Sequence, residues 1–268
     1  MRKMPQPFTI DFTNDGHIHT SLCRHAVGEM SEYVEAALNK GLAGITFLEH
    51  IEVNIHGKQR TWLAEDDIDT YFHHGNLLKK KYQGRLEIQL GAELGYSPDG
   101  VPALKRIIDR YPWENIGLSY HFLPHNDQHV NMMSRDKVQL TILEEIGFSE
   151  VATKYFTGLL QALNHISCDK ICHLDAVLRH APTFQLSRRH YLLIDRILTR
   201  MQEKGTALEI NTSGFSLRNH PFPCAPILKK AMDLGLPLVI GSDAHNPDQV
   251  GRFFTGIQDY LCRASCTL

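Results

Sequence analysis

The sequence predicts a single α/β domain whose parallel sheet closes into an irregular, seven-stranded barrel. Short apolar runs typical of buried strands alternate with helical segments, and no polar linker, repeat or low-complexity stretch separates them. Side chains of metal-binding type follow most of these runs. An open, doubly wound sheet would show the same alternation, but ligands carried on so many strands converge more naturally in a closed barrel.

Seven segments have the apolar composition and the length of buried strands. The first is expected to start in the alternating stretch from Phe8 to Phe12 and to continue into the polar motif that comes next in the chain. The predicted strands span residues 11–19, 43–49, 86–93, 115–121, 170–175, 206–212 and 237–242.

Helical segments separate the strands. Ser31 is the predicted N-cap of the first helix and Gly41 its C′ residue, and glycines at 205 and 235 end the last two. The long fourth segment is expected to break near Gly147. The predicted helices span residues 31–40, 66–82, 99–111, 135–165, 186–204 and 223–234.

The first strand ends in the motif Asp15-Gly16-His17-Ile18-His19, and His25 lies six residues further on. Residues two apart on an extended segment point to the same side, so His17 and His19 can bind one cation. Neutral imidazole suits zinc, manganese or iron. A lone His-x-His pair is weak evidence for a metal, so a metal site requires further ligands downstream in the chain.

Metal-binding residue types recur where later strands end. In a parallel barrel the carboxyl ends of all strands meet on one face, where catalytic groups accumulate. A polar cap at the end of a strand is the simpler explanation of any one such residue, but the recurrence favours a hydrolase with several metal ions. The residues are Glu49, His50, Glu93, His121, His173, Asp175, Asp243 and His245.

Composition excludes several classes of protein. A hydrophobic fraction of 43% is ordinary for a globular domain, and a formal charge of −2 does not favour nucleic acid as a partner. No apolar run is long enough to span a bilayer, and Met1 to Phe12 lacks a secretory pattern, so no membrane partner and a cytoplasmic location are expected. The six cysteines lack the paired spacing of a structural zinc site, and Cys23 is expected to be a packed, reduced thiol.

The ordered set of motifs resembles the polymerase and histidinol phosphatase (PHP) family, and within it the histidinol-phosphatase branch. This resemblance covers nearly the whole chain and implies one PHP-type domain over residues 1–268 with a distorted TIM-like (β/α)7 barrel. It rests on Asp15-Gly16-His17-Ile18-His19 with His25, Thr46-Phe47-Leu48-Glu49-His50, Gly91-Ala92-Glu93, His121-Phe122, His173-Leu174-Asp175, Leu208-Glu209-Ile210-Asn211-Thr212-Ser213-Gly214 and Gly241-Ser242-Asp243-Ala244-His245.

The resemblance also implies a cluster of three divalent metal ions, and their nitrogen and oxygen ligands suit zinc, manganese or iron equally. The first ion would be held by His17, His19, Glu93 and Asp243. Glu93 would bridge to a second ion held by His121 and His173, and the third would be held by His25, His50 and His245. The substrate pocket would be lined by Asn211, Arg179 and Arg218.

Such a cluster predicts hydrolysis of a phosphate monoester in one step, because metal ions neutralise the phosphoryl oxygens and activate a bridging hydroxide. Asp243 and Glu93 are the expected catalytic carboxylates. The leaving group would take its proton from a metal-bound water, Asp243 or His220, and the sequence does not choose among them.

Three further residues have expected roles around the cluster. Glu49 and Asp175 are expected either to orient neighbouring imidazoles or simply to cap their strands. Tyr120 is larger than the residue that relatives tend to have before the histidine of the fourth strand, and its ring is expected to narrow the pocket.

These predictions leave three functions open. The first is a phosphatase that hydrolyses L-histidinol phosphate to L-histidinol and phosphate in histidine biosynthesis. The second is a PHP phosphatase or phosphodiesterase for another small phosphate ester, such as a nucleotide. The third is a metal-binding module without activity, against which the complete ligand set argues.

Overall fold

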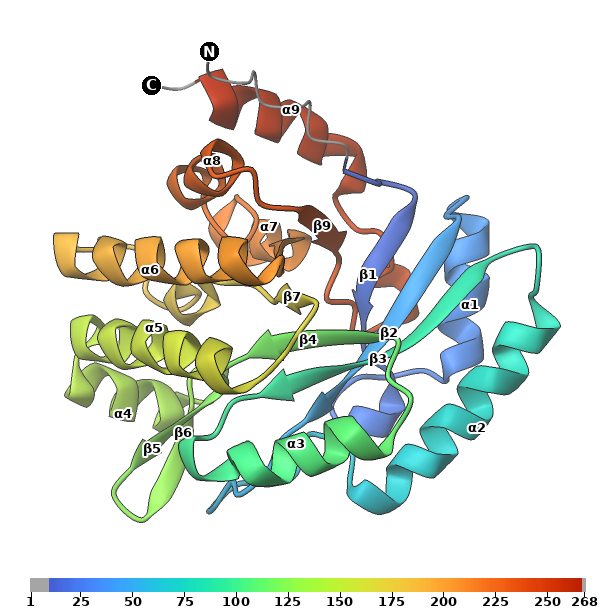
Figure 1. The fold of residues 1–268 in the computed structure, drawn as a ribbon, viewed down its shortest axis with the longest axis horizontal. Coiled ribbons are helices and arrows are strands. Elements are labelled where there is room, and N and C mark those ends of the chain that lie inside the picture. Colours follow the sequence, from blue (N-terminus) through green and yellow to red (C-terminus); the bar gives the residue numbers. More distant parts are fainter. Residues whose placement is uncertain (1–9, 267–268) are drawn as a thin grey trace.

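The structure is a computed structural model that describes residues 10–266 (Figure 1). The described residues form a seven-stranded parallel sheet in the order β1-β2-β3-β4-β7-β8-β9. Its strands are β1 (Asn14–Ile18), β2 (Gly44–Ile51), β3 (Glu87–Gly95), β4 (Asn115–Ser119), β7 (Lys170–Ile171), β8 (Ala207–Asn211) and β9 (Leu238–Gly241). All seven predicted strands are confirmed, although the expected start at Phe8 lies outside the described residues.

The sheet is nearly closed between its first and last strands. Ile18, at the end of β1, forms a parallel bridge with Ala244, which lies just after β9. The amide of His19 donates a hydrogen bond to the carbonyl of Ala244 at 2.9 Å. The carboxyl ends of the strands therefore form a ring, and the predicted barrel is confirmed.

Helices surround the sheet (Figure 1). In α5, buried residues recur at helical spacing, as at Val151, Tyr155 and Leu159, and form the stripe that packs inward. The helices are α1 (Met30–Asn39), α2 (Glu65–Lys81), α3 (Val101–Arg110), α4 (Lys137–Ile146), α5 (Phe148–His165), α6 (Arg188–Lys204), α7 (Phe215–Arg218), α8 (Ala225–Asp233) and α9 (Phe254–Cys266). Short 3₁₀ segments lie at Ser21–Cys23, Pro98–Gly100, Ala176–Leu178, Thr212–Gly214 and Pro247–Gln249.

The predicted helices are confirmed, including the break in the fourth segment. Gly147 separates α4 from α5 with φ 87°, a conformation that glycine adopts without a steric penalty. The predicted N-cap Ser31 is wrong, because α1 begins at Met30 with Glu29 as its N-cap. The amide of Glu29 donates to the Glu32 carboxylate at 2.6 Å, so the capping interaction lies two residues earlier.

The structure contains elements that the sequence patterns did not predict. The antiparallel hairpin of β5 (Phe122–His125) and β6 (Gln128–Asn131) comes directly after β4 and turns at Asn126, which has φ 53°. Helix α9 was also not predicted. Strand β7 is shorter than expected, because the backbone at His173 turns away with φ 30°.

The expectation that Tyr120 narrows the pocket is wrong. Its side chain is buried and packs on the outer side of the barrel, with its ring 6.1 Å from that of Tyr155 in α5 and 5.3 Å from that of Tyr96. Neighbouring residues of an extended segment point to opposite sides, so Tyr120 points outward where His121 points inward.

Candidate metal centre

The side chains predicted as metal ligands lie together where the strands end. Each makes a close contact with at least one other member, through an imidazole nitrogen or a carboxylate oxygen. We call them the ligand cluster: His17, His19, His25, His50, Glu93, His121, His173, Asp243 and His245.

Glu93 lies at the centre of the ligand cluster and is fully buried at the end of β3. Its Oε1 lies 2.7 Å from His173 Nε2 and 3.3 Å from His121 Nε2. Its Oε2 lies 3.5 Å from the Nε2 atoms of both His17 and His19. Oε2 also lies 2.9 Å from Nδ1 of His50. The two carboxylate oxygens therefore face different imidazoles, two at Oε1 and three at Oε2.

Several nitrogen and oxygen atoms of the ligand cluster converge on one another. Nε2 of His17 lies 2.8 Å from Nε2 of His19, and Nε2 of His25 lies 2.9 Å from Nε2 of His245. Buried Glu93 Oε2 accepts no hydrogen bond from the described residues. Converging lone pairs on nitrogen and oxygen are what a divalent cation requires, so the donor set fits a metal.

A second part of the ligand cluster consists of His25, His50 and His245, whose nitrogens lie close enough together to hold one ion. Burial lowers the pKa of each of these imidazoles to about 4, with a further lowering from neighbouring histidines. All three are therefore neutral at pH 7, which is the form that binds metals.

Asp243 lies beside His19, with its Oδ1 3.4 Å from His19 Nε2. Burial raises the pKa of this carboxyl, but the hydrogen bond with His19 and nearby imidazoles outweigh burial and hold it well below its usual range. The backbone of Asp243 has φ 52°, a left-handed conformation that is uncommon outside glycine and asparagine. Asp243 is therefore an ionised carboxylate held in an unusual backbone geometry.

Two carboxylates orient imidazoles of the ligand cluster, and the sequence patterns assigned neither of them. Glu209 Oε1 accepts from His17 Nδ1 at 2.6 Å, and Glu52 Oε1 accepts from His121 Nδ1 at 2.7 Å. A carboxylate on Nδ1 leaves Nε2 free for a metal. One available signal was that both glutamates lie in or directly after an apolar strand, Glu209 in β8 and Glu52 after β2.

The expectation that Glu49 and Asp175 orient imidazoles is wrong. Glu49 Oε1 instead accepts from the amide and hydroxyl of Thr20, at 2.8 and 2.6 Å. Asp175 Oδ2 accepts from the amide of Cys224 at 3.0 Å. Both carboxylates thus hold backbone segments distant in the sequence, which is a structural role, although neither caps its own strand.

Cys23 lies beside the ligand cluster, close enough to His19 and His245 for its sulfur to share an ion with them. Its thiol, however, donates to the carbonyl of Thr20 at 3.1 Å, and burial raises its pKa above that of a free cysteine. The protonated thiol is therefore the stable form of Cys23 in the metal-free chain.

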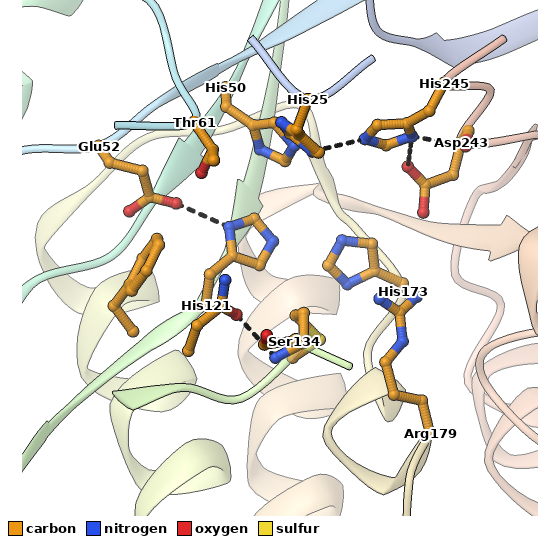
Figure 2. A pocket seen from close by; sticks show the side chains of 13 residues that line it. His25, His50, Glu52, Thr61, His121, Ser134, His173, Arg179, Asp243 and His245 are labelled. Atoms are coloured by element: carbon orange, nitrogen blue, oxygen red, sulfur yellow. Dashed lines mark hydrogen bonds and ion pairs between the residues drawn. The ribbon is translucent and has the colours of Figure 1, made fainter. Parts of the chain in front are cut away.

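A cavity of about 300 Å³ opens beside the ligand cluster (Figure 2). Figure 2 shows His121, His173, Asp243 and His245 around it, with Glu52 next to His121. His25, His50 and Arg179 also line the cavity, and further wall residues come from the loop after β2 and from the segment that starts with β5. Those residues are Thr61, Phe122, Asn131, Met133 and Ser134.

Of the three predicted substrate-binding residues and His220, only Arg179 lines this cavity, and Asp243, the other candidate proton donor, lines it as well. Arg218 donates from Nη1 to the carbonyl of Ala181 at 3.4 Å, and His220 Nδ1 lies 2.8 Å from the carbonyl of Pro221. Asn211 is fully buried, and its side chain bonds to Glu209 and Ser213. The structure therefore brings Arg179 to the ligand cluster and leaves the other three outside the wall of the cavity.

Comparison with known proteins identifies the family. Residues 15–213, well over half of the chain, match the family model described as PHP domain. The chain belongs to the PHP domain family. Residues 226–261 of this PHP protein also match a model described as PHP-associated.

Relatives of this PHP protein have similar lengths. A histidinol-phosphatase of Bacillus subtilis is 27% identical over 254 residues, which cover 88% of this chain and 95% of the relative. A Deinococcus radiodurans protein named "Probable histidinol-phosphatase" is 27% identical over 252 residues, or 91% of each protein.

A solved structure has the same fold. It is a histidinol phosphate phosphatase from Lactococcus lactis, complexed with zinc, L-histidinol and phosphate. It has a TM-score of 0.78 and 19% identity, and the match covers 96% of this chain and 94% of that one. Within residues 10–266 of the PHP protein, no helix is long and apolar enough to cross a membrane.

Proposed function

We propose that this PHP protein is a metal-dependent phosphatase that hydrolyses L-histidinol phosphate to L-histidinol and phosphate. Glu93 is the main support, because its two oxygens face different imidazoles beside a cavity that also contains an arginine. Relatives of similar length that are named histidinol-phosphatases support the choice of substrate.

The ligand cluster holds three divalent ions in this proposal. His17, His19, Glu93 and Asp243 hold the first, and Glu93 bridges to a second that His121 and His173 complete. His25, His50 and His245 hold the third. Zinc, manganese and iron all suit these ligands, and the Lactococcus lactis structure contains zinc.

Bound ions would lower the barrier to hydrolysis by neutralising the phosphoryl oxygens and activating water. The protein's own residues bind and orient the ester. Arg179 lies in the cavity wall, and its guanidinium can donate to two phosphate oxygens at once. Glu93 and Asp243 fix the charge around the reacting phosphate.

The size of the cavity supports a small substrate. A volume of about 300 Å³ lies at the lower end of the range for small-molecule sites. Its wall away from the ligand cluster contains Thr61, Asn131 and Ser134, which offer hydrogen-bonding groups to a polar leaving group. A polymeric substrate has no comparable support from the cavity or from the overall charge.

We also infer that the whole chain forms one domain. Strands β1 to β8 lie in the segment that matches the PHP domain model, and β9 lies in the PHP-associated segment. Strand β9 pairs in parallel with β8, and Ala244 bridges to β1. Both matched segments are therefore parts of one barrel.

Phosphate release from L-histidinol phosphate tests the function. Purified protein would be assayed with Mn²⁺, Zn²⁺ or Fe²⁺, beside nucleoside monophosphates and a generic phosphodiester. A strong preference for L-histidinol phosphate supports the proposal. Preference for another ester would keep the metal chemistry and reject the substrate, and no turnover with any ion would favour the inactive module.

Glu93→Gln is the variant for this assay, and Glu87→Gln is its control because both residues lie on β3. Glu87 is exposed at the opposite end of that strand. We expect Glu93→Gln to lower kcat by about a thousandfold or more, and Glu87→Gln to leave it unchanged. Full activity of Glu93→Gln would reject the bridging role.

A further inference from the structure

Glu209 is a buried carboxylate beneath the ligand cluster, and the proposed chemistry does not use it. It is 0% exposed, in β8 between Leu208 and Ile210. A charged group in such a strand is expensive to bury unless its oxygens are satisfied, so its partners indicate what it does.

Both oxygens of Glu209 accept hydrogen bonds. Oε1 accepts from His17 Nδ1 at 2.6 Å. Oε2 accepts from the backbone amide of His173 at 2.9 Å and from the side-chain amide of Asn211 at 3.0 Å. One carboxylate thus contacts an imidazole proposed to hold the first ion and the backbone of a residue proposed to hold the second.

The bond to His173 holds an unusual backbone conformation. His173 has φ 30°, outside the regions that non-glycine residues prefer. Such conformations persist only where surrounding contacts fix them. Because Glu209 Oε2 accepts from this amide, it helps to set where the His173 imidazole points.

A buried lysine holds the backbone next to His17. Lys170 is buried in β7, and its Nζ donates to the carbonyl of Gly16, next to His17. Glu209 and Lys170 therefore fix the ring of His17 and the main chain beside it.

The backbone next to Glu209 leaves room for the carboxylate. A Cβ on Gly241 would lie 2.6 Å from Glu209 Oε1 and 2.6 Å from the Cβ of His17. Any larger residue at position 241 would push these two groups apart. The glycine thus allows the short contact between His17 and Glu209.

Glu52 provides a contrast within the same ligand cluster. Its Oε1 accepts from His121 Nδ1 at 2.7 Å, while its Oε2 has no hydrogen-bond partner in the described part of the chain. Glu52 therefore orients one imidazole through one oxygen. Glu209 differs because both of its oxygens accept hydrogen bonds. Oε1 accepts from His17, of the first proposed ion site, and Oε2 accepts from His173, of the second.

We propose that Glu209 is a positioning residue that couples the first two ion sites by fixing His17 and His173 relative to each other. The inference rests on the ligand assignment of the proposed function. A glutamine at position 209 keeps one oxygen as an acceptor but replaces the other with an NH₂ group that faces an N–H donor. It can therefore accept from the donors of only one of the two original oxygens. A glutamine at position 52 keeps the single accepted bond.

Metal binding of Glu209→Gln, Glu209→Asp and Glu52→Gln tests this inference, with zinc content and zinc affinity measured by chelator competition. We expect Glu209→Gln to bind zinc about 10–100-fold more weakly at both of the first two sites, and Glu52→Gln to weaken only the site that contains His121. Glu209→Asp should also be weakened, because it keeps the charge but is too short to reach both donors.

Wild-type affinity in Glu209→Gln and Glu209→Asp would overturn the inference, as would an equal loss at both sites in Glu52→Gln. A wild-type chain that binds no zinc would instead reject the ligand assignment itself. Should the position-209 variants fail to fold, ¹⁵N NMR of the zinc-loaded wild type decides. The inference requires His17 bound through Nε2 with a proton on Nδ1, and binding through Nδ1 would overturn it.

Discussion

His17 Nε2 lies 2.8 Å from His19 Nε2, so one proton must lie between two nitrogens that could otherwise hold an ion. Burial lowers the pKa of His17, but the charges of Glu209 and Glu93 outweigh burial and raise it well above its usual range. Burial lowers the pKa of His19 well below its usual range. The proton therefore belongs to His17 in the metal-free chain.

Metal binding should release this proton, because a cation and the Nε2 proton of His17 compete for one position. We expect zinc affinity to rise about tenfold per pH unit between pH 6 and 8 for each proton released. Calorimetric titrations in two buffers with different ionisation enthalpies count the protons. An affinity that does not change with pH, with no proton released, would contradict this prediction.

The burial of Glu49 should make the stability of the protein depend on pH. Burial raises its pKa to about 8 from the usual 4.5, and its Oε2 has no hydrogen-bond partner within residues 10–266. A carboxyl with a raised pKa contributes stability that is complete below pH 4.5 and is lost as pH rises towards 8. Glutamine cannot ionise, so Glu49→Gln avoids this loss.

We therefore expect the free energy of unfolding of wild type to fall by roughly 4 kcal/mol relative to that of Glu49→Gln between pH 4.5 and 8. Urea unfolding of both metal-free proteins across this range measures the difference. Glu87→Gln, on the exposed end of β3, is the control for the substitution itself. A difference that stays constant with pH would show that Glu49 is ionised throughout.

Alanine at position 158, in α5, should destabilise the protein. A Cβ added there would lie 2.4 Å from Tyr120 Cε1, so the side chain would overpack the contact between α5 and the barrel. The Cβ of Gly256, in α9, would meet nothing within 4 Å. We expect Gly158→Ala to destabilise by about 1–3 kcal/mol and Gly256→Ala to stabilise by about 0.5–1 kcal/mol.

Thermal unfolding of Gly158→Ala and Gly256→Ala measures the two predicted stability changes. Replacing Tyr120 with leucine in the Gly158→Ala background should recover part of the loss, because the smaller side chain vacates the space. Equal unfolding temperatures for both glycine variants would contradict the packing argument.

Most of the fold was predictable because the signals for it are local. Apolar runs and terminal glycines fix strands and helices within short windows, as at Gly41 and Gly205 after α1 and α6. Ser31 was misassigned because the capping bond instead runs from the amide of Glu29 to the side chain of Glu32. The β5–β6 hairpin and α9 lacked comparably strong local patterns.

The ligand cluster was predictable from spacing and from the family motifs, but its supporting carboxylates were not. Glu49 and Asp175 lie close to ligands in the sequence, yet they bind Thr20 and Cys224. Glu209 lies 192 positions from His17 and contacts it only after the barrel closes. Adjacency in the chain is thus a poor guide to which carboxylate orients which imidazole.

Arg179 and Arg218 were equal candidates for phosphate in the sequence, and the structure separates them. Arg179 lines the cavity, and its buried Nε has no hydrogen-bond partner among the described residues. Its guanidinium lies over the ring of Phe222, 5.6 Å from the centroid, which holds it in place. Arg218 lies outside the cavity wall and donates to Ala181.

Replacing each arginine with methionine tests which one binds phosphate, because methionine keeps the apolar stem and removes the charge. A charged hydrogen bond contributes about 1.5–3 kcal/mol, so we expect Arg179→Met to lower kcat/KM about 10–100-fold, mostly through KM. Inhibition by inorganic phosphate should weaken in parallel, with zinc content unchanged. Arg218→Met should stay within about threefold of wild type, and a larger loss there than in Arg179→Met would move the phosphate contact to Arg218.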